Sequence, residues 1–368
     1  MNYTIRKLPM NRLTQAVLLC GAVMTMALSN AVVPVLNQIT PDAVLQGSVY
    51  SAYFLGAFLM VVPAGWLSDK IGRRPLIRAG LLGTAAAAVI LWVTYPDPAA
   101  AVLLRLAEGL CTGMFVAAAM ALVNSEEEHK RLSGEFVALM NIGMVAGLII
   151  SGWGAAVHPY AGVAVFGAGT VLAAVLSLGS CDEPQTDGEV LRAAEIGGVI
   201  TSHLWLWFAM FIFCGATGVV ISLYPDFSGF SAEVTGMITA LMSVATAVCV
   251  YAASRFSFFD SLSVLRLAGV VMALAIPAVI LTPLGMIGVG AVFGVITVAI
   301  LNYLAETRLP QGVMNGLFTM TQYAGMAFLP FGAGILLTAA GYLPVFLTTA
   351  ALSLAAGLLV VHCPCYVR

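Results

Sequence analysis

Charged residues are scarce in this chain. Asp, Glu, Lys and Arg make up 9% of its 368 residues, whereas hydrophobic residues make up 61%. A soluble domain has about 25% charged residues, because its surface must be hydrated. So little charge excludes an ordinary water-soluble globular protein and predicts that lipid surrounds most of the chain.

The chain also lacks the features of several other protein classes. Its formal net charge is −2, so it has no basic excess with which to bind nucleic acid. Its seven cysteines are scattered and show no disulfide framework. No nucleotide-binding loop, catalytic pair of carboxylates or His/Cys cluster with metal-ligand spacing stands out. We therefore expect no enzymatic activity, no catalytic residues, no metal site and no cofactor.

Long apolar runs fill the sequence instead. A bilayer core about 30 Å thick needs about 20 apolar residues in an α-helix. Polar residues, proline or glycine divide the chain into runs of that size, and the predicted spans are 13–36, 47–68, 76–95, 99–123, 133–157, 160–180, 199–224, 231–254, 262–282, 284–304, 313–338 and 342–362. The first run is longer than the apolar part of a signal peptide, so we interpret it as a span and not as a cleaved leader. The sequence predicts an all-α membrane protein with twelve transmembrane helices.

The basic residues are distributed on one side of these spans. When the N-terminus is placed in the cytoplasm, every Lys and Arg except Arg105 falls in a cytoplasmic segment. These residues are Arg6, Lys7, Arg12, Lys70, Arg73, Arg74, Arg78, Lys130, Arg131, Arg192, Arg255, Arg266, Arg308 and Arg368. Cytoplasmic loops carry an excess of Lys and Arg, and a miscount by one span would scramble the pattern. We therefore predict a multi-pass protein of the cytoplasmic (inner) membrane with both termini in the cytoplasm.

A polar, acidic stretch after the sixth span divides the chain into two halves. The predicted units are an N-terminal six-helix bundle over 1–181, a cytoplasmic linker over 182–198 and a C-terminal six-helix bundle over 199–368. A faint repeat supports this division, because Leu-Ile-Arg-Ala-Gly opens the third span and Leu-Arg-Leu-Ala-Gly occupies the matching place in the second half. Parallel six-helix repeats are a known transporter architecture.

A charged motif lies between the second and third spans. Residues 65–75 read Gly-Trp-Leu-Ser-Asp-Lys-Ile-Gly-Arg-Arg-Pro. This segment resembles the loop signature of the major facilitator superfamily, G-x-L-[SA]-D-[KR]-x-G-R-[KR]-x, in the loop where that family carries it. Together with the span count, the resemblance covers essentially the whole chain. It implies a secondary transporter built as two pseudo-symmetric six-helix bundles.

The motif residues suggest a gate at the cytoplasmic side. Gly65 is small enough to let helices approach closely, and Gly72 permits a tight turn. By the resemblance, Asp69 would face the N-terminus of the eleventh span, where the helix dipole favours a carboxylate. Arg73 would pair with an acid at the end of the fourth span, for which Glu126 is the nearest candidate. The simpler interpretation is that the motif, with Lys70 and Arg74, only fixes the topology.

Arg105 and Glu108 are the ionisable residues that the sequence places well inside a span. Charges at such depth are expensive and usually face a cavity or each other, and the i, i+3 spacing puts these two on one helix face. The stretch Arg-Leu-Ala-Glu-Gly resembles the family's fourth-helix motif, R-x-x-[QE]-G, whose arginine is associated with proton coupling or charge balance. A permanent ion pair that only neutralises two buried charges is the alternative.

Other polar residues are candidates for a central cavity. By the resemblance, the first, fourth, seventh and tenth helices line the transport path, with further residues from their neighbours. The candidates are Asn30, Asn37, Tyr53, Asn141, Thr217, Asn302 and Gln322. For any one of them, ordinary hydrogen bonding between helices is the competing interpretation.

The fifth span resembles an antiporter motif only in part. Gly143 and Gly147 match G-x(3)-G-P-x(2)-G-G, but Leu148 stands where proline is expected and Ser151 replaces a glycine. The spacing of the two glycines indicates close helix packing in its own right. The partial match therefore weakens an assignment as an antiporter.

These observations lead to one functional hypothesis and two alternatives. The first is a proton-coupled exporter of amphipathic or drug-like small molecules, working by alternating access as a monomer in the lipid bilayer. The second is an uptake symporter or facilitator for a sugar or small metabolite. The third is a non-transporting membrane sensor.

Overall fold

The computed structural model describes residues 11–124, 126, 129–179, 193–255, 260–306 and 311–362. A few side chains inside the helices, that of Asp69 among them, lie outside this description. Within the described residues there is no β-strand, and twelve helices are long and apolar enough to cross a membrane. The prediction of an all-α fold with twelve spans is confirmed.

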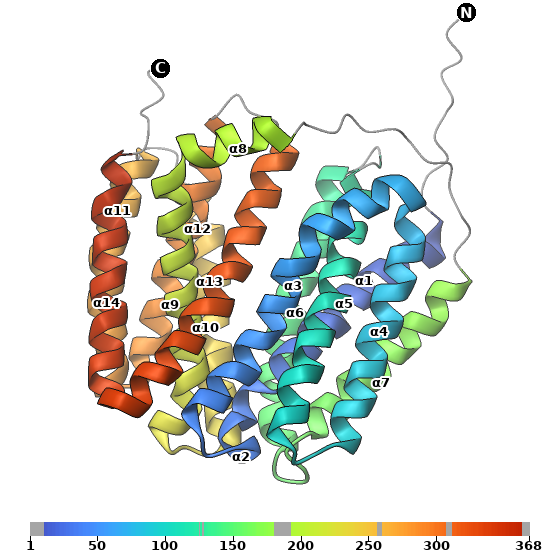
Figure 1. The fold of residues 1–368 in the computed structure, drawn as a ribbon, viewed down its shortest axis with the longest axis horizontal. Helices are drawn as coiled ribbons and strands as arrows, with labels where there is room; N and C mark the ends of the chain where they lie inside the picture. The colour runs from blue at the N-terminus through green and yellow to red at the C-terminus, as the bar shows by residue number, and fades with distance from the viewer. Residues whose placement is uncertain are drawn as a thin grey trace, which may run out of the picture.

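The helices follow one another with short connections (Figure 1). They are α1 (Arg12–Ala31), the 3-10 turn Val33–Val35, α2 (Leu36–Ile39), α3 (Ala43–Ile71), α4 (Arg73–Val93), α5 (Pro98–Asn124), α6 (His129–Gly154), α7 (Ala161–Leu178), α8 (Ala193–Ser202), α9 (Leu204–Ser228), α10 (Ala232–Ala253), α11 (Ser261–Leu281), α12 (Leu284–Glu306), α13 (Gln311–Ala340), α14 (Tyr342–Leu359) and the 3-10 turn Val360–His362. Pro34 lies in the turn that separates α1 from α2, and the three elements together form the first span.

Local sequence explains where many helices begin and end. The side chain of Asp42 caps α3 by accepting the Val44 N–H at 2.8 Å, and Asp260 caps α11 in the same way from Ser263 at 2.9 Å. Gly72 has a φ of +91°, which favours glycine and lets α3 turn directly into α4. The predicted tight turn at Gly72 is therefore confirmed.

The seventh span begins later than the sequence predicts. The chain from Ala193 to Ser202 forms α8, so residue 199, where the prediction started the C-terminal bundle, lies inside this extra helix. His203 breaks the helical path with φ −117° and ψ 27°, and α9 starts at Leu204. Most of the predicted linker, up to residue 192, lies outside the described residues.

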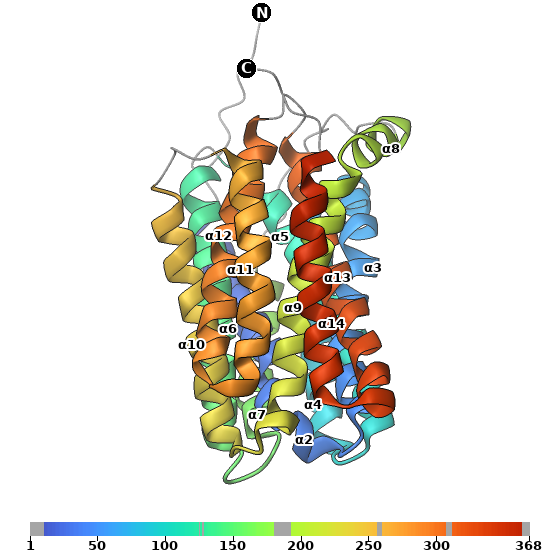
Figure 2. The same ribbon diagram turned by 90° about the vertical axis from the view of Figure 1, so that its left-hand side faces the viewer.

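The spanning helices pack as two groups (Figures 1 and 2). In the first, α1 packs on α6 and α7, and α5 packs on α3 and α4; in the second, α10 and α11 pack on α12, and α9 packs on α13. The groups meet where α3 contacts α13 and where α6 contacts α10. Both contacts lie toward the end of the molecule at which α3 begins, and at the end where α3 turns into α4 the ribbons diverge (Figure 1).

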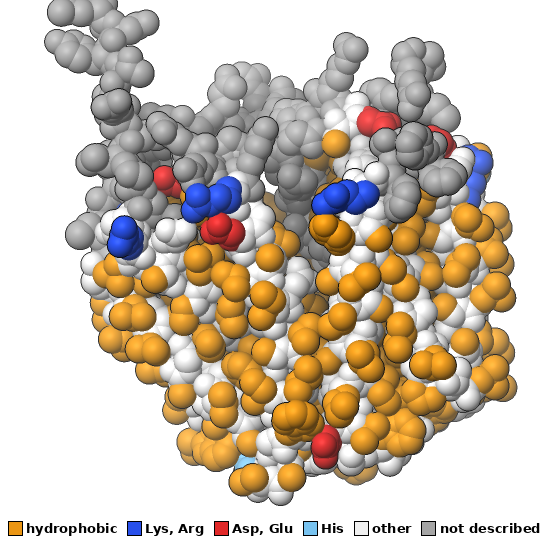
Figure 3. Space-filling model, turned by 180° about the vertical axis from the view of Figure 1, so that it is seen from behind, with side chains coloured by type: hydrophobic (Ala, Val, Ile, Leu, Met, Phe, Trp, Pro, Cys, Tyr) orange, Lys and Arg blue, Asp and Glu red, His pale blue; other side chains and the backbone are white. Residues whose placement is uncertain are grey.

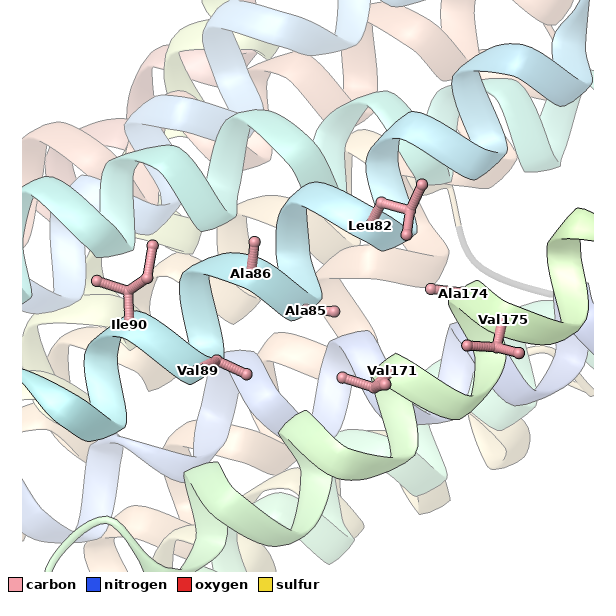
Figure 4. Close-up of a pocket in the computed structure, with 8 residues that line it drawn as sticks. All are labelled: Leu82, Ala85, Ala86, Val89, Ile90, Val171, Ala174 and Val175. Carbon is pink, nitrogen blue, oxygen red and sulfur yellow. The ribbon is translucent and has the colours of Figure 1, made fainter.

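Side chains on the outside match a lipid surrounding. Hydrophobic side chains cover the flank, and the Lys and Arg side chains in view lie near the diverging end (Figure 3). A shallow groove between α4 and α7 is lined only by Ala, Val, Leu and Ile (Figure 4). Because that groove contains no polar side chain, it offers no specific binding chemistry, and lipid is its natural neighbour.

Candidate functional site

The buried charges lie on α5, inside the first group of helices. Nη1 of Arg105 donates to Oε2 of Glu108 at 2.8 Å, and the two side chains are 1% and 0% exposed. Nη2 of Arg105 donates to the carbonyl oxygen of Ser29 on α1 at 2.7 Å. The pair predicted from sequence is therefore formed, and it is sealed from the surface in this structure.

An aromatic ring completes the environment of the arginine. Cζ of Arg105 lies 4.6 Å from the centroid of the Tyr53 ring on α3, a cation–π distance. Tyr53 is 2% exposed. Three helices thus contribute to the site: α5 supplies both charges, α1 a carbonyl oxygen and α3 a ring face.

Two glycines bring α3 and α5 close enough for these contacts. A Cβ atom on Gly109 would overlap the Tyr53 carbonyl group, and one on Gly56 would lie 2.6 Å from the Leu110 nitrogen. Larger side chains at these positions would hold the helices apart. The backbone contact therefore positions Tyr53 beside Arg105.

The pair is not fully hydrogen-bonded within the described part of the chain. Oε1 of Glu108 and Nε of Arg105 are both buried there without a hydrogen-bond partner. Part of the hydrogen-bonding capacity of this buried pair is therefore not used by the described protein groups, which has a cost in free energy for charged groups away from water.

The remaining polar candidates do not converge on the ion pair. The Nδ2 group of Asn30 donates to Met26 at 3.0 Å, that of Asn141 donates to Val137 at 2.9 Å, and the Thr217 hydroxyl donates to Cys214 at 2.7 Å, each on its own helix. Asn30 also reaches the Ser29 hydroxyl at 3.0 Å, which places it next to the arginine's carbonyl partner. The polar groups of these residues are thus largely occupied by their own helix.

Asn37 connects the two groups of helices. Its Nδ2 donates to the carbonyl oxygen of Pro225 on α9 at 3.2 Å. This bond lies at the end where the groups are in contact. Asn302 is exposed and Gln322 is half-buried, and a cavity role for either stays a prediction.

The glycines predicted to allow close helix packing differ in how near their neighbours lie. Cβ atoms on Gly143 and Gly147 of α6 would overlap the carbonyl groups of Val23 and Ala27 on α1, so the predicted close packing is present. A Cβ on Gly65 would meet no atom within 4 Å. Among the described residues no atom is that close, so the close approach predicted at Gly65 stays a prediction.

The other motif residues lie at the diverging end. Nζ of Lys70 sits 3.7 Å above the Trp66 ring, and Arg74 is buried. The side chain of Asp69 lies outside the described residues, so its contact with the eleventh span stays a prediction. The pairing of Arg73 with Glu126 also stays a prediction.

The groups are closed along two backbone seams at the opposite end. In the first seam, a Cβ on Gly47 of α3 would lie 2.9 Å from the carbonyl oxygen of Pro330 on α13. A Cβ on Gly334 of α13 would lie 2.9 Å from the carbonyl oxygen of Ala43 on α3. In the second, a Cβ on Gly152 of α6 would lie 2.6 Å from the Ala232 carbonyl oxygen of α10. Contacts this tight exclude passage between the helices.

Sequence reasoning missed several of these residues. Ser29 contacts Arg105 through its backbone oxygen, so no side-chain pattern could indicate that contact. Gly56 and Gly109 are small residues in apolar helices, which is a general indication of close helix packing. The sequence holds 37 glycines, however, and nothing distinguishes these two from the others. Tyr53 was predicted as a cavity residue, and its stacking on Arg105 was not foreseen.

Comparisons with known proteins agree with this architecture. The sequence profile of the Major Facilitator Superfamily matches residues 16–330. The tetracycline resistance protein of class C from Escherichia coli is 32% identical over 136 residues, and that match covers 33% of this chain and 33% of the relative. The chain therefore aligns with about a third of the length of this curated relative.

Solved structures resemble the fold over nearly its whole length. The nucleoside transporter NupG superposes with a TM-score of 0.76 at 12% identity, covering 97% of this chain and 100% of that structure. A D-xylose-proton symporter superposes with a TM-score of 0.74 at 12% identity, covering 94% and 96%. At such identities the likeness establishes the fold alone.

Proposed function

This chain belongs to the Major Facilitator Superfamily and is a multi-pass membrane transporter, and from that premise we propose that it exports a small organic solute in exchange for protons. The solute is amphipathic and drug-like, and both chain termini lie in the cytoplasm. Transport proceeds by alternating access, in which the solute path opens to one side of the membrane at a time.

The ion pair between Arg105 and Glu108 is the observation that carries the proposal. A carboxylate sealed in apolar surroundings is penalised for its charge, and the adjacent guanidinium compensates for that penalty. A change of conformation that separates the two or admits water alters this balance. Glu108 can then take up a proton in one state and release it in the other, which couples proton movement to alternating access.

The arrangement of the helices supports the same cycle. The seams at Gly47 and Gly152 close one end, while at the other a Cβ on Gly65 or Gly316 would meet no described atom within 4 Å. The Lys and Arg side chains in view in Figure 3 lie at the diverging end, which by the positive-inside rule is cytoplasmic. We therefore assign this structure to an inward-facing state.

The direction and the substrate class rest on the relatives. The tetracycline resistance protein matches a third of this chain, and it favours export of a drug-like compound. The likeness to a D-xylose-proton symporter keeps proton-driven uptake of a sugar as the second candidate. Both candidates use protons, and the test below separates them.

Everted membrane vesicles test the proposal. Their cytoplasmic face points outward, so an exporter accumulates its substrate inside when respiration acidifies the lumen. We expect accumulation of tetracycline that collapses when the pH gradient is dissipated, and we expect Glu108→Gln to lose this pH-driven component. Glu135→Gln is the matched control, because Glu135 forms an exposed ion pair with Arg131 at 3.0 Å and should transport as before.

Other outcomes would contradict parts of the proposal. Unchanged pH-driven transport in Glu108→Gln would remove the coupling role of this residue. Accumulation of D-xylose or uridine in right-side-out vesicles, with none of tetracycline in everted ones, would favour uptake. Absence of flux for every probe would favour the non-transporting sensor.

A further inference from the structure

The ring of Tyr53 lies between the ion pair and a second aromatic ring. Its face carries the Arg105 guanidinium at 4.6 Å, and it meets Phe54 edge to face, with centroids 5.1 Å apart and planes at 89°. Tyr53 is 2% exposed, so it has little room to move independently of either neighbour. A displacement of the guanidinium is therefore transmitted to the position of Phe54.

Phe54 continues this contact into the other group of helices. Its ring centroid lies 6.2 Å from that of Tyr323 on α13, with an angle of 39° between the planes. Tyr50, one turn earlier on α3, packs against Phe54 with a centroid distance of 5.0 Å. Adjacent residues of α3 thus join a charge in the N-terminal group to a helix of the C-terminal group.

The position of this contact along the seam allows it to influence how α3 and α13 separate. From Gly47 the seam between α3 and α13 runs toward the diverging end, and Phe54 lies about two turns further along. Beyond it, a Cβ on Gly65 of α3 or on Gly316 of α13 would meet nothing within 4 Å. The contact between Phe54 and Tyr323 is thus near the point where the two helices separate.

We propose that Tyr53 and Phe54 are positioning residues that transmit the state of the Arg105–Glu108 pair to the contact between α3 and α13. When Glu108 is charged, it holds the guanidinium over Tyr53, and the edge-to-face contact holds Phe54 against Tyr323. When Glu108 is neutral, the guanidinium loses its charged partner and keeps the Ser29 carbonyl, so it moves relative to Tyr53, the ring shifts, and the two helices reorient. This inference rests on the proposed transport cycle, but it concerns the conformational equilibrium and can be tested without a substrate.

A double-mutant cycle on that equilibrium is the test. Spin labels at Ile71→Cys on α3 and Gly316→Cys on α13 report the distance across the diverging end. Ile71 is exposed and a Cβ at Gly316 meets no neighbour, so both positions accept a label. Double electron–electron resonance on the full chain in lipid nanodiscs, with its other cysteines replaced, gives the ratio of open to closed populations.

The expected result is non-additivity between Glu108→Gln and Phe54→Leu. Each variant alone should change the population ratio, and the double variant should differ from the product of the two changes by about three- to tenfold, the range of an aromatic pair beyond its burial of area. Should Phe54→Leu fail to reach the membrane, Phe54→Met carries the same test, because its flexible chain fills the space without a ring.

Phe58→Leu is the matched control. Phe58 lies one turn further along α3 and also contacts α13, with its ring centroid 6.2 Å from that of Phe328, but it makes no ring contact with Tyr53 among the described residues. Its effect should combine with Glu108→Gln without coupling. Additive behaviour of Phe54→Leu with Glu108→Gln, or equal coupling at Phe58, overturns the inference. Lack of transport with the expected coupling would instead contradict only the proposed function.

Discussion

At the scale of single residues, the energetics of the site depend on the buried ion pair between Arg105 and Glu108. Breaking a buried pair by removing one partner leaves an uncompensated charge and destabilises by about 3–5 kcal/mol, whereas replacing both partners by apolar residues is often neutral. Arg105 has three kinds of partner, namely a carboxylate, a backbone oxygen and a ring face. We therefore expect the pair to affect the choice of conformation more than the net stability.

Variants that remove one or both charges of the pair should differ in their stability. Arg105→Ala should lower the stability of the purified protein by about 3–5 kcal/mol, because it strands the Glu108 carboxylate in an apolar site. The double variant Arg105→Met with Glu108→Leu should recover most of that loss. Thermal unfolding in detergent measures both, and a double variant no more stable than Arg105→Ala would refute the view that the stranded charge is the cause.

The sequence could indicate this pair but not its surroundings. Arg105 and Glu108 stood out because charges are rare inside apolar spans, and their spacing put them on one helix face. The carbonyl of Ser29 and the ring of Tyr53 come from other helices, so their contacts depend on how α1, α3 and α5 pack. Nothing in the local pattern of residues specifies that packing.

At the scale of helices, glycines decide how closely pairs approach. Those of α6 give a direct contrast, since a Cβ on Gly147 would overlap the Ala27 carbonyl while one on Gly134 would meet nothing within 4 Å. A tight backbone contact cannot accept an extra methyl group without moving a helix. Where a helical glycine has space around it, substitution by alanine stabilises the helix, because alanine has the higher helix propensity.

We therefore predict opposite effects for two equal substitutions on one helix. Gly147→Ala should destabilise the protein by about 1–3 kcal/mol through the shift of α6 from α1. Gly134→Ala should be neutral or stabilise it by up to about 1 kcal/mol. Parallel unfolding measurements compare them, and equal losses would show that the contact at Gly147 is not tight.

The seam at Gly47 leads to a prediction about conformation. Gly47→Val should force α3 away from the Pro330 carbonyl on α13 and so favour the state that is open at this end and closed at the diverging end. The distance between labels at Ile71→Cys and Gly316→Cys should then shorten. Gly332→Val is the control on α13, because a Cβ there meets nothing within 4 Å, and a similar shortening in it would argue against a specific role of the seam.

Helix positions were the most predictable feature of the chain. The predicted break between the ninth and tenth spans is confirmed, since α11 ends at Leu281, Thr282 is extended and α12 starts at Leu284. The start of the seventh span was wrong, because α8 continues the apolar pattern up to Ser202 before the turn at His203. Hydropathy alone cannot distinguish an added helix from the beginning of a span.

At the scale of the whole molecule, the placement of charge predicts the orientation in the membrane. Ile71 lies at the cationic end and is 53% exposed, and Val157 lies in the connection between α6 and α7 at the other end and is 89% exposed. In intact cells, a membrane-impermeant maleimide should label Val157→Cys but not Ile71→Cys. The reverse pattern would invert the orientation and would remove the basis for calling this structure inward-facing.

Coupled flux through the purified chain tests the central claim most directly. The protein is reconstituted in liposomes, a pH gradient is imposed, and the movement of tetracycline, D-xylose and uridine is followed against protein-free liposomes. The account predicts flux of tetracycline against its own concentration gradient, in the direction opposite to proton flow, in the wild type but not in Glu108→Gln. Equal flux of every probe with and without the protein, from a preparation shown to be folded, would contradict it.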